Sequence, residues 1–178
     1  MENTRFSGTG VALVTPFRDD GSIDVEDLRK HVEFQIDNGV NVMVPGGTTG
    51  EGVTLSTDEH KLLIRTTVEA TRGRTSVLAG AGGSDTVDVV RKARAAREAG
   101  ADGILSVSPA YNKPTQRGLI EHYRAVAGAV DCPVIIYNVP GRTASNVLPE
   151  TVLALAEIEN IAGVKEASGD VDQVMTLI

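Results

Sequence analysis

Short apolar runs alternate with longer amphipathic runs along the whole chain. The apolar runs recur roughly every 30 residues, which is the length of one βα unit with short loops. They are nearly continuous in Val, Ile, Leu and Ala, as is typical of parallel strands that are covered on both faces. They predict strands at 10–14, 40–44, 76–79, 103–107, 134–138 and 161–165.

The amphipathic runs between them have the length and the end signals of helices. They predict helices at 25–37, 58–71, 86–99, 116–130 and 149–157, with another in the tail after Asp170. Residues that favour a helix N-terminus precede or begin these runs: Asp24, Ser56 with Glu59 in capping-box spacing, Ser84, Thr115 and Pro149.

Six βα units fit either a doubly wound sheet or part of a (β/α)8 TIM barrel. A dinucleotide-binding doubly wound sheet predicts Gly-x-Gly-x-x-Gly after the first strand, where this chain has Thr15-Pro16-Phe17. Residues capable of chemistry instead follow several different strands at their C-terminal ends, where barrel active sites form. We therefore expect a single α/β domain over residues 1–178 that supplies about the first six βα units of a (β/α)8 barrel.

A complete barrel of this repeat length needs about two more units, or roughly 60 further residues. We expect that the last barrel strands and the C-terminal helical region are absent from this chain. The first and the sixth strand are then unpaired edges of the sheet. An inactive barrel fragment, acting through a complementary fragment, is an alternative interpretation.

Composition restricts the class of partner and the compartment. The 178-residue chain has a formal net charge of -7 and no cluster of Lys and Arg, which argues against nucleic acid. No apolar run approaches the roughly 20 residues that span a bilayer, and residues 1–5 lack the apolar core of a signal peptide. The single cysteine, Cys132, excludes an internal disulfide and a cysteine-rich metal site. We expect a soluble cytoplasmic protein.

The last predicted strand ends on Lys165, which is followed by a turn of small residues. Burial disfavours the charged form of a lysine and lowers its pKa, so that a neutral amine becomes available. A neutral amine attacks a carbonyl and forms a Schiff base. The alternative is an ordinary solvated lysine at a strand end.

Three other strand ends carry polar residues that suit carbonyl chemistry. Thr48 and Thr49 lie in a glycine-rich loop after the second strand, which lacks the Gly-Lys-Ser/Thr ending of a phosphate loop. Tyr111 lies between two prolines after the fourth strand, and Tyr137 ends the fifth strand, where its phenol can move protons. Arg142 follows Tyr137 and offers a planar fork for a carboxylate, with a surface salt bridge as the alternative.

These motifs together resemble the dihydrodipicolinate synthase (4-hydroxy-tetrahydrodipicolinate synthase) family, within the pyruvate-dependent class I aldolases that include the N-acetylneuraminate lyases. The resemblance runs from Gly8 to the end of the chain. It rests on four segments: Gly47-Thr48-Thr49-Gly50-Glu51, Tyr111-Asn112-Lys113-Pro114, Tyr137-Asn138-Val139-Pro140-Gly141-Arg142-Thr143 and Gly163-Val164-Lys165-Glu166.

The resemblance implies a role for each site residue. Lys165 would form the Schiff base with pyruvate, and Tyr137 would move protons, in a relay that Thr48 completes with Tyr111 from a neighbouring subunit. Thr49 would hold the pyruvate carboxylate, and Arg142 would receive the carboxylate of L-aspartate 4-semialdehyde. The product would be the dipicolinate precursor of lysine biosynthesis. The resemblance also implies a dimer or a homotetramer, and neither a metal nor an organic cofactor, because the lysine itself is the electron sink.

Thr48 and Arg142 favour the synthase over its relatives. In the neuraminate lyases the glycine loop usually reads Gly-Ser-Thr-Gly-Glu and the arginine is missing. A pyruvate-dependent aldolase for another aldehyde, such as a neuraminate or a 2-keto-3-deoxy sugar acid, is the alternative. The positions that bind lysine as feedback inhibitor in many family members are mostly changed here (Thr57, Ser84, Asp88 and Ala110, with His60 kept). We therefore expect weak or no inhibition by lysine.

Overall fold

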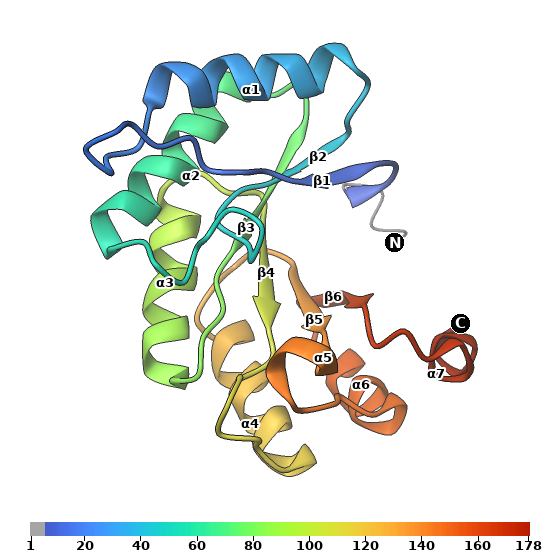
Figure 1. Ribbon diagram of the computed structural model, residues 1–178. Coiled ribbons are helices and arrows are strands. Elements are labelled where there is room, and N and C mark those ends of the chain that lie inside the picture. The colour runs from blue at the N-terminus through green and yellow to red at the C-terminus, as the bar shows by residue number, and fades with distance from the viewer. Residues whose placement is uncertain (1–5) are drawn as a thin grey trace.

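The computed structural model describes residues 6–178, in which strands and helices alternate as predicted (Figure 1). The strands are β1 (Gly10–Ala12), β2 (Val42–Val44), β3 (Ser76–Gly80), β4 (Gly103–Val107), β5 (Val134–Asn138) and β6 (Ile161–Glu166). The helices are α1 (Val25–Asp37), α2 (Thr57–Thr71), α3 (Thr86–Glu98), α4 (Gln116–Ala127), α5 (Pro140–Thr143), α6 (Pro149–Ala156) and α7 (Val171–Leu177).

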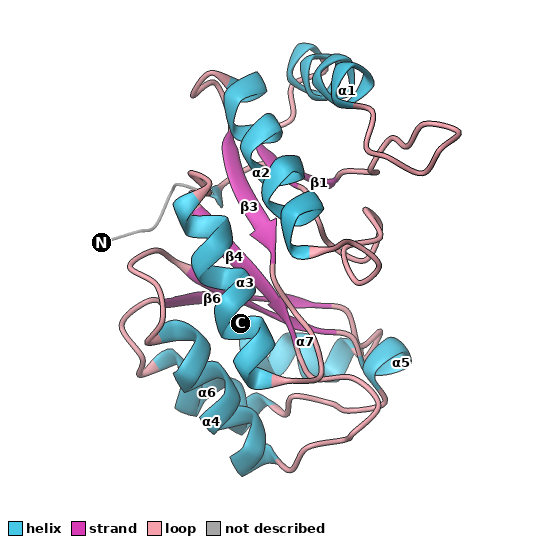
Figure 2. Cartoon of the chain, turned by 90° about the vertical axis from the view of Figure 1, so that its left-hand side faces the viewer, coloured by secondary structure: helices cyan, strands magenta, loops and turns pink. Residues whose placement is uncertain are grey.

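All six strands are parallel, and they pair in chain order from β1 to β6. Successive right-handed crossovers place the connecting helices on one face of such a sheet. The two views agree, because α2, α3 and α4 lie along the same side of the strands (Figures 1 and 2). β1 and β6 are the edges of the sheet, as predicted. This is the arrangement of six consecutive βα units of a (β/α)8 barrel.

The two faces of the curved sheet have separate apolar cores, because successive side chains of a strand point to opposite faces. On β5, Val134 and Ile136 belong to clusters that also contain helix residues, such as Val126 and Leu119. Ile135 and Tyr137 instead pack with side chains of β2, β3 and β4 on the inner face, around Val42, Val44, Leu78 and Leu105. Every second residue of β5 therefore faces the barrel interior.

Most predicted helix starts are confirmed by their caps. The side chain of Asp24 accepts from Glu26 and Asp27 N–H, the capping box of Ser56 and Glu59 is complete, and Thr115 accepts from Gly118 N–H. The cap predicted for α3 is wrong. Asp85 caps that helix, whereas the Ser84 hydroxyl donates across to the carbonyl oxygen of Ala110 at 2.8 Å.

Some predicted boundaries shift for local reasons, and one short helix was not predicted. β2 begins at Val42 instead of residue 40, because the N–H of Val40 bonds back to the Gln35 carbonyl at the end of α1. α4 ends at Ala127, three residues before the predicted end, with Gly128 as its C-cap. The short helix α5 was not predicted, since four residues with Pro140 at their start carry no helical periodicity.

No helix in residues 6–178 is both long enough and apolar enough to cross a membrane.

The outer core predicts a clear difference between two leucines. Leu119 of α4 is fully buried, whereas Leu153 of α6 is 62% exposed. Leu119→Ala should lower the free energy of unfolding by about 2–5 kcal/mol, because it leaves a cavity between α4 and the sheet. Leu153→Ala should change it by less than about 0.5 kcal/mol. Urea unfolding followed by circular dichroism measures both, and equal losses would contradict the assignment of the core.

Candidate active site

Lys165 and Tyr137 lie side by side at the C-terminal ends of β6 and β5. The strands are in register there, with Tyr137 opposite Lys165. The Lys165 Nζ atom lies 4.3 Å from the centroid of the Tyr137 ring, within the range of a cation–π contact. The sheet therefore brings the predicted nucleophile and the predicted proton carrier together.

This register depends on an irregularity near the start of the two strands. Val134 pairs with Ile161, but the next residue, Ile135, pairs with Gly163, so β6 has one extra residue at this point. Without that shift Tyr137 would lie opposite Val164, and Lys165 would be displaced by one residue along the strand. The extra residue thus sets the pairing of Tyr137 with Lys165.

The Lys165 side chain faces a hollow of about 350 Å³ on the inner face of the sheet. The walls of this hollow are small or apolar residues, including Gly10, Ala12, Val42, Val44, Leu78 and Gly163. Lys165 remains accessible to solvent, but desolvation by these neighbours lowers its pKa below the ordinary value of 10.5. The direction of this shift is the one that a reactive amine requires.

The glycine-rich loop after β2 packs its backbone directly onto β3. The N–H of Gly80 donates to the Pro45 carbonyl at 2.8 Å. A Cβ atom on Gly80 would lie 2.4 Å from the carbonyl oxygen of Gly46, and one on Gly52 would lie 1.9 Å from the same atom. Glycine is therefore required at both positions, because no side chain fits between these backbones.

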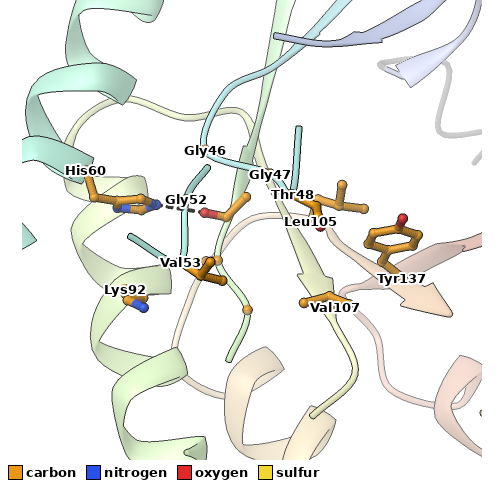
Figure 3. A pocket seen from close by; sticks show the side chains of 13 residues that line it. Gly46, Gly47, Thr48, Gly52, Val53, His60, Lys92, Leu105, Val107 and Tyr137 are labelled. Atoms are coloured by element: carbon orange, nitrogen blue, oxygen red, sulfur yellow. Dashed lines mark hydrogen bonds between the residues drawn. The ribbon is translucent and has the colours of Figure 1, made fainter. Parts of the chain in front are cut away.

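This loop places Thr48 near Tyr137. Both residues line a second, narrow hollow of about 40 Å³, and Leu105 lines this hollow as well as the one that contains Lys165. Figure 3 shows Thr48 and Tyr137 on one side of the second hollow, and His60 and Lys92 on the other. Thr49 lies next to Thr48 in the loop with an exposed side chain, and it lines neither hollow.

Two other predicted site residues line neither hollow. Tyr111 is 94% exposed and has a φ of 71°. Its loop is fixed by the bond from the Tyr111 N–H to the Thr143 carbonyl at 3.3 Å. Arg142 lies exposed on α5, and within residues 6–178 no carboxylate pairs with it. The surface salt bridge considered for Arg142 is therefore not found in the described chain.

Two of the three histidines are buried structural residues. His60 supports the glycine loop: its Nε2 lies 2.7 Å from the Gly80 carbonyl, and burial lowers its pKa. His122 lies between α4 and α3, with its Nδ1 2.9 Å from the Thr86 hydroxyl, and burial lowers its pKa to about 4. Among residues 6–178, no group of three His, Cys, Asp or Glu side chains is arranged to hold a metal ion.

A largely buried polar cluster behind Tyr137 and Lys165 was not predicted. It consists of Asn138, Asn146, Glu166 and Gln173. The Asn138 amide donates to Glu166 at 2.9 Å and to Asn146 at 2.8 Å, and the Gln173 amide donates to Glu166 at 3.0 Å. Asn138 and Glu166 directly follow the two site residues in sequence, but this adjacency does not reveal that their side chains meet.

The chain matches one protein family and several curated proteins over nearly its whole length. The model of the dihydrodipicolinate synthetase family matches residues 5–178. The curated 4-hydroxy-tetrahydrodipicolinate synthase of Syntrophus aciditrophicus is 53% identical over 173 residues, covering 97% of this chain and 59% of its own length. The corresponding protein of Prosthecochloris aestuarii is 52% identical over 179 residues, covering 100% of this chain and 60% of its own length. The chain thus spans about three fifths of these relatives.

Solved structures give the same result. Dihydrodipicolinate synthase from Aquifex aeolicus superposes with a TM-score of 0.93 at 46% identity, over 97% of this chain and 59% of that one. The chloride-inhibited synthase from Acinetobacter baumannii complexed with pyruvate has a TM-score of 0.95 at 46% identity, over 97% of this chain and 60% of that one.

The lowered pKa of Lys165 predicts a stability cost that depends on pH. Between its lowered folded-state pKa and 10.5 the unfolded chain binds more protons at this site, so stability rises with pH in that window. Lys165→Met should therefore raise the free energy of unfolding at about pH 7, and this gain should shrink towards about pH 9.5. Urea unfolding at both pH values measures the gain. A variant that is less stable at neutral pH would contradict the prediction.

Proposed function

The chain belongs to the dihydrodipicolinate synthetase family, and we propose that it condenses pyruvate with L-aspartate 4-semialdehyde through a Schiff base on Lys165. The product is 4-hydroxy-tetrahydrodipicolinate, an intermediate of lysine biosynthesis. The observation that carries this proposal is the Lys165 amine, with its lowered pKa, 4.3 Å from the centroid of the Tyr137 ring at the C-terminal edge of the sheet. This is the edge at which barrel enzymes assemble their sites.

In the first half of the reaction, the neutral Lys165 amine attacks the keto carbon of pyruvate. Proton transfers through Tyr137 convert the carbonyl oxygen into water, which leaves as the imine forms. The protonated imine then withdraws electrons, so that the methyl group of pyruvate loses a proton and an enamine results.

In the second half, the enamine carbon attacks the aldehyde carbon of the second substrate and forms the carbon–carbon bond. The aldehyde oxygen takes up a proton and becomes a hydroxyl group. The amino group of the former semialdehyde then attacks the imine carbon, closes the ring and releases the Lys165 amine. Tyr137 serves as acid or base in each half, since its ring centroid lies 4.3 Å from the lysine nitrogen.

Thr48 and Thr49 have separate roles in this proposal. Thr48 lines the same hollow as Tyr137, which supports a place in the proton relay. Thr49 would hold the pyruvate carboxylate from the glycine loop. Tyr111, at 94% exposure on a fixed loop, suits a contact with a neighbouring subunit better than one within its own chain. We therefore propose a homo-oligomer, built from the dimer that this contact requires and extended to a homotetramer, and we place the enzyme in the cytoplasm.

Borohydride reduction in the presence of pyruvate tests the central step. Reduction of the imine should fix a pyruvate-sized mass increase on the chain, and peptide mapping should place it on Lys165. Lys165→Arg should abolish the adduct, because an arginine side chain forms no such imine, whereas the exposed-lysine control Lys30→Arg should keep it. An adduct on another lysine, or none on a chain folded by circular dichroism, would contradict the proposal.

A separate test concerns the second substrate. Arg142→Gln should raise the KM for L-aspartate 4-semialdehyde by about ten- to a hundredfold, because it removes a charged donor to a carboxylate. It should leave the rate of pyruvate trapping on Lys165 unchanged. Arg117→Gln, an exposed arginine at the start of α4, is the control and should change neither. Activity with a different aldehyde, and none with this one, would point to another aldolase of the same superfamily.

A further inference from the structure

The largely buried cluster of Asn138, Asn146, Glu166 and Gln173 joins the two strand ends that carry Tyr137 and Lys165. In the register of β5 and β6, Tyr137 lies opposite Lys165 and Asn138 lies opposite Glu166. Successive side chains point to opposite faces of a sheet. The first pair therefore faces the barrel interior, and the second pair faces the helix layer behind it.

The Asn138 amide is fully buried and all of its bonding groups are used. Its Nδ2 donates to Glu166 at 2.9 Å and to Asn146 at 2.8 Å, and its Oδ1 accepts from the Val147 N–H at 2.9 Å. This set of partners permits only one orientation of the amide. A carboxylate in place of this amide would face the Glu166 carboxylate at hydrogen-bond distance.

Glu166 is the charged member of the cluster. It accepts from Asn138, from the Gln173 amide at 3.0 Å and from the Ser168 N–H at 2.6 Å. Partial burial opposes its charge, but these bonds outweigh that effect and hold its pKa below the ordinary value of 4.5. Near neutral pH it is therefore an anion that ties β5, the turn after β6 and α7 to one point.

We propose that Asn138 and Glu166 are positioning residues. Their contact on the opposite side of the sheet fixes the side chains of Tyr137 and Lys165 relative to each other. This inference rests on the proposed role of Lys165. Neither residue touches the hollow in which Lys165 lies. Their effect acts through the register of the two strand ends, where a displacement of about 1 Å can reduce a rate by about a hundredfold.

Three variants test the inference by breaking and restoring the contact. Asn138→Asp places two carboxylates together, and Glu166→Gln places amide donors against each other. In the double variant, the carboxylate at position 138 accepts a hydrogen bond from the amide at position 166. The side-chain amides of Asn146 and Gln173 can rotate so that their donors and acceptors again face suitable partners. Each single variant should lower the rate of pyruvate trapping on Lys165 by about tenfold or more, and the double variant should return it to within about threefold of the original rate. Glu157→Gln, at an exposed position after α6, is the control.

Circular dichroism and urea unfolding give the folded fraction of each variant. Trapping that is unchanged in both folded single variants would overturn the inference. So would losses that merely follow the folded fraction, with no recovery in the double variant. If a single variant does not fold, Gln173→Met removes one donor to Glu166 and leaves the Asn138 contact. It should lower trapping by about threefold, and no reduction would again overturn the inference.

A measurement without pyruvate separates this inference from the proposed function. Acetylation of Lys165, relative to the exposed Lys113 in the same sample, reports the neutral fraction of the Lys165 amine. Glu166→Gln removes a negative charge. If this charge acted on Lys165 only through electrostatics, its loss would lower the pKa of Lys165 and increase the ratio. If the substitution instead displaces Lys165 from its hollow, the ammonium returns to water, its pKa rises and the ratio decreases.

We expect a decrease in Glu166→Gln that the double variant reverses. If the original chain traps no pyruvate but shows this pattern, the proposed function fails and the positioning role stands. If it traps pyruvate and neither rate nor ratio changes in the single variants, the positioning role fails and the function stands.

Discussion

The pairing of β5 with β6 is the constraint on which the site depends. One extra residue in β6, between the partners of Val134 and Ile135, moves Lys165 into register with Tyr137. Because side chains alternate between the two faces of a sheet, a slip of one residue would exchange the inner and outer faces of this strand. The same register that places an amine beside a phenol on the inner face places Asn138 beside Glu166 behind them. One strand register therefore positions both the site residues and the polar contact behind them.

The two faces of the sheet provide two different environments. The outer face is packed against helices and buries apolar side chains such as Leu119 and Ile136 completely. The inner face is lined by small residues, including Gly10, Ala12 and Gly163, and leaves space around the lysine. A close-packed core here would exclude any substrate, whereas open water would leave the amine with its ordinary pKa. A partly desolvated hollow meets both requirements, at a cost in stability that the lysine itself imposes.

Backbone contacts and buried polar groups hold the segments around the site. The glycine loop that carries Thr48 lies on β3 at backbone contact distance, and the buried His60 bonds to the carbonyl of Gly80 beneath it. Behind the strand ends, the amide and carboxylate cluster satisfies its own members. Tyr111 and Arg142 are different, because both are exposed on short, well-anchored segments.

The sequence alone determined the order and class of every strand and of every helix except α5, since the apolar runs and most helix caps are local signals. Lys165 and Tyr137 were identified as strand ends for the same reason, and the family motifs supplied their roles. The tertiary structure decided what depends on distant partners. Ser84 bonds to Ala110 and leaves Asp85 to cap α3, Asn138 meets Glu166 behind the site, and the extra residue in β6 sets which side chain faces Lys165. No local pattern records these outcomes, because each is fixed by a hydrogen bond or a strand pairing to another part of the fold.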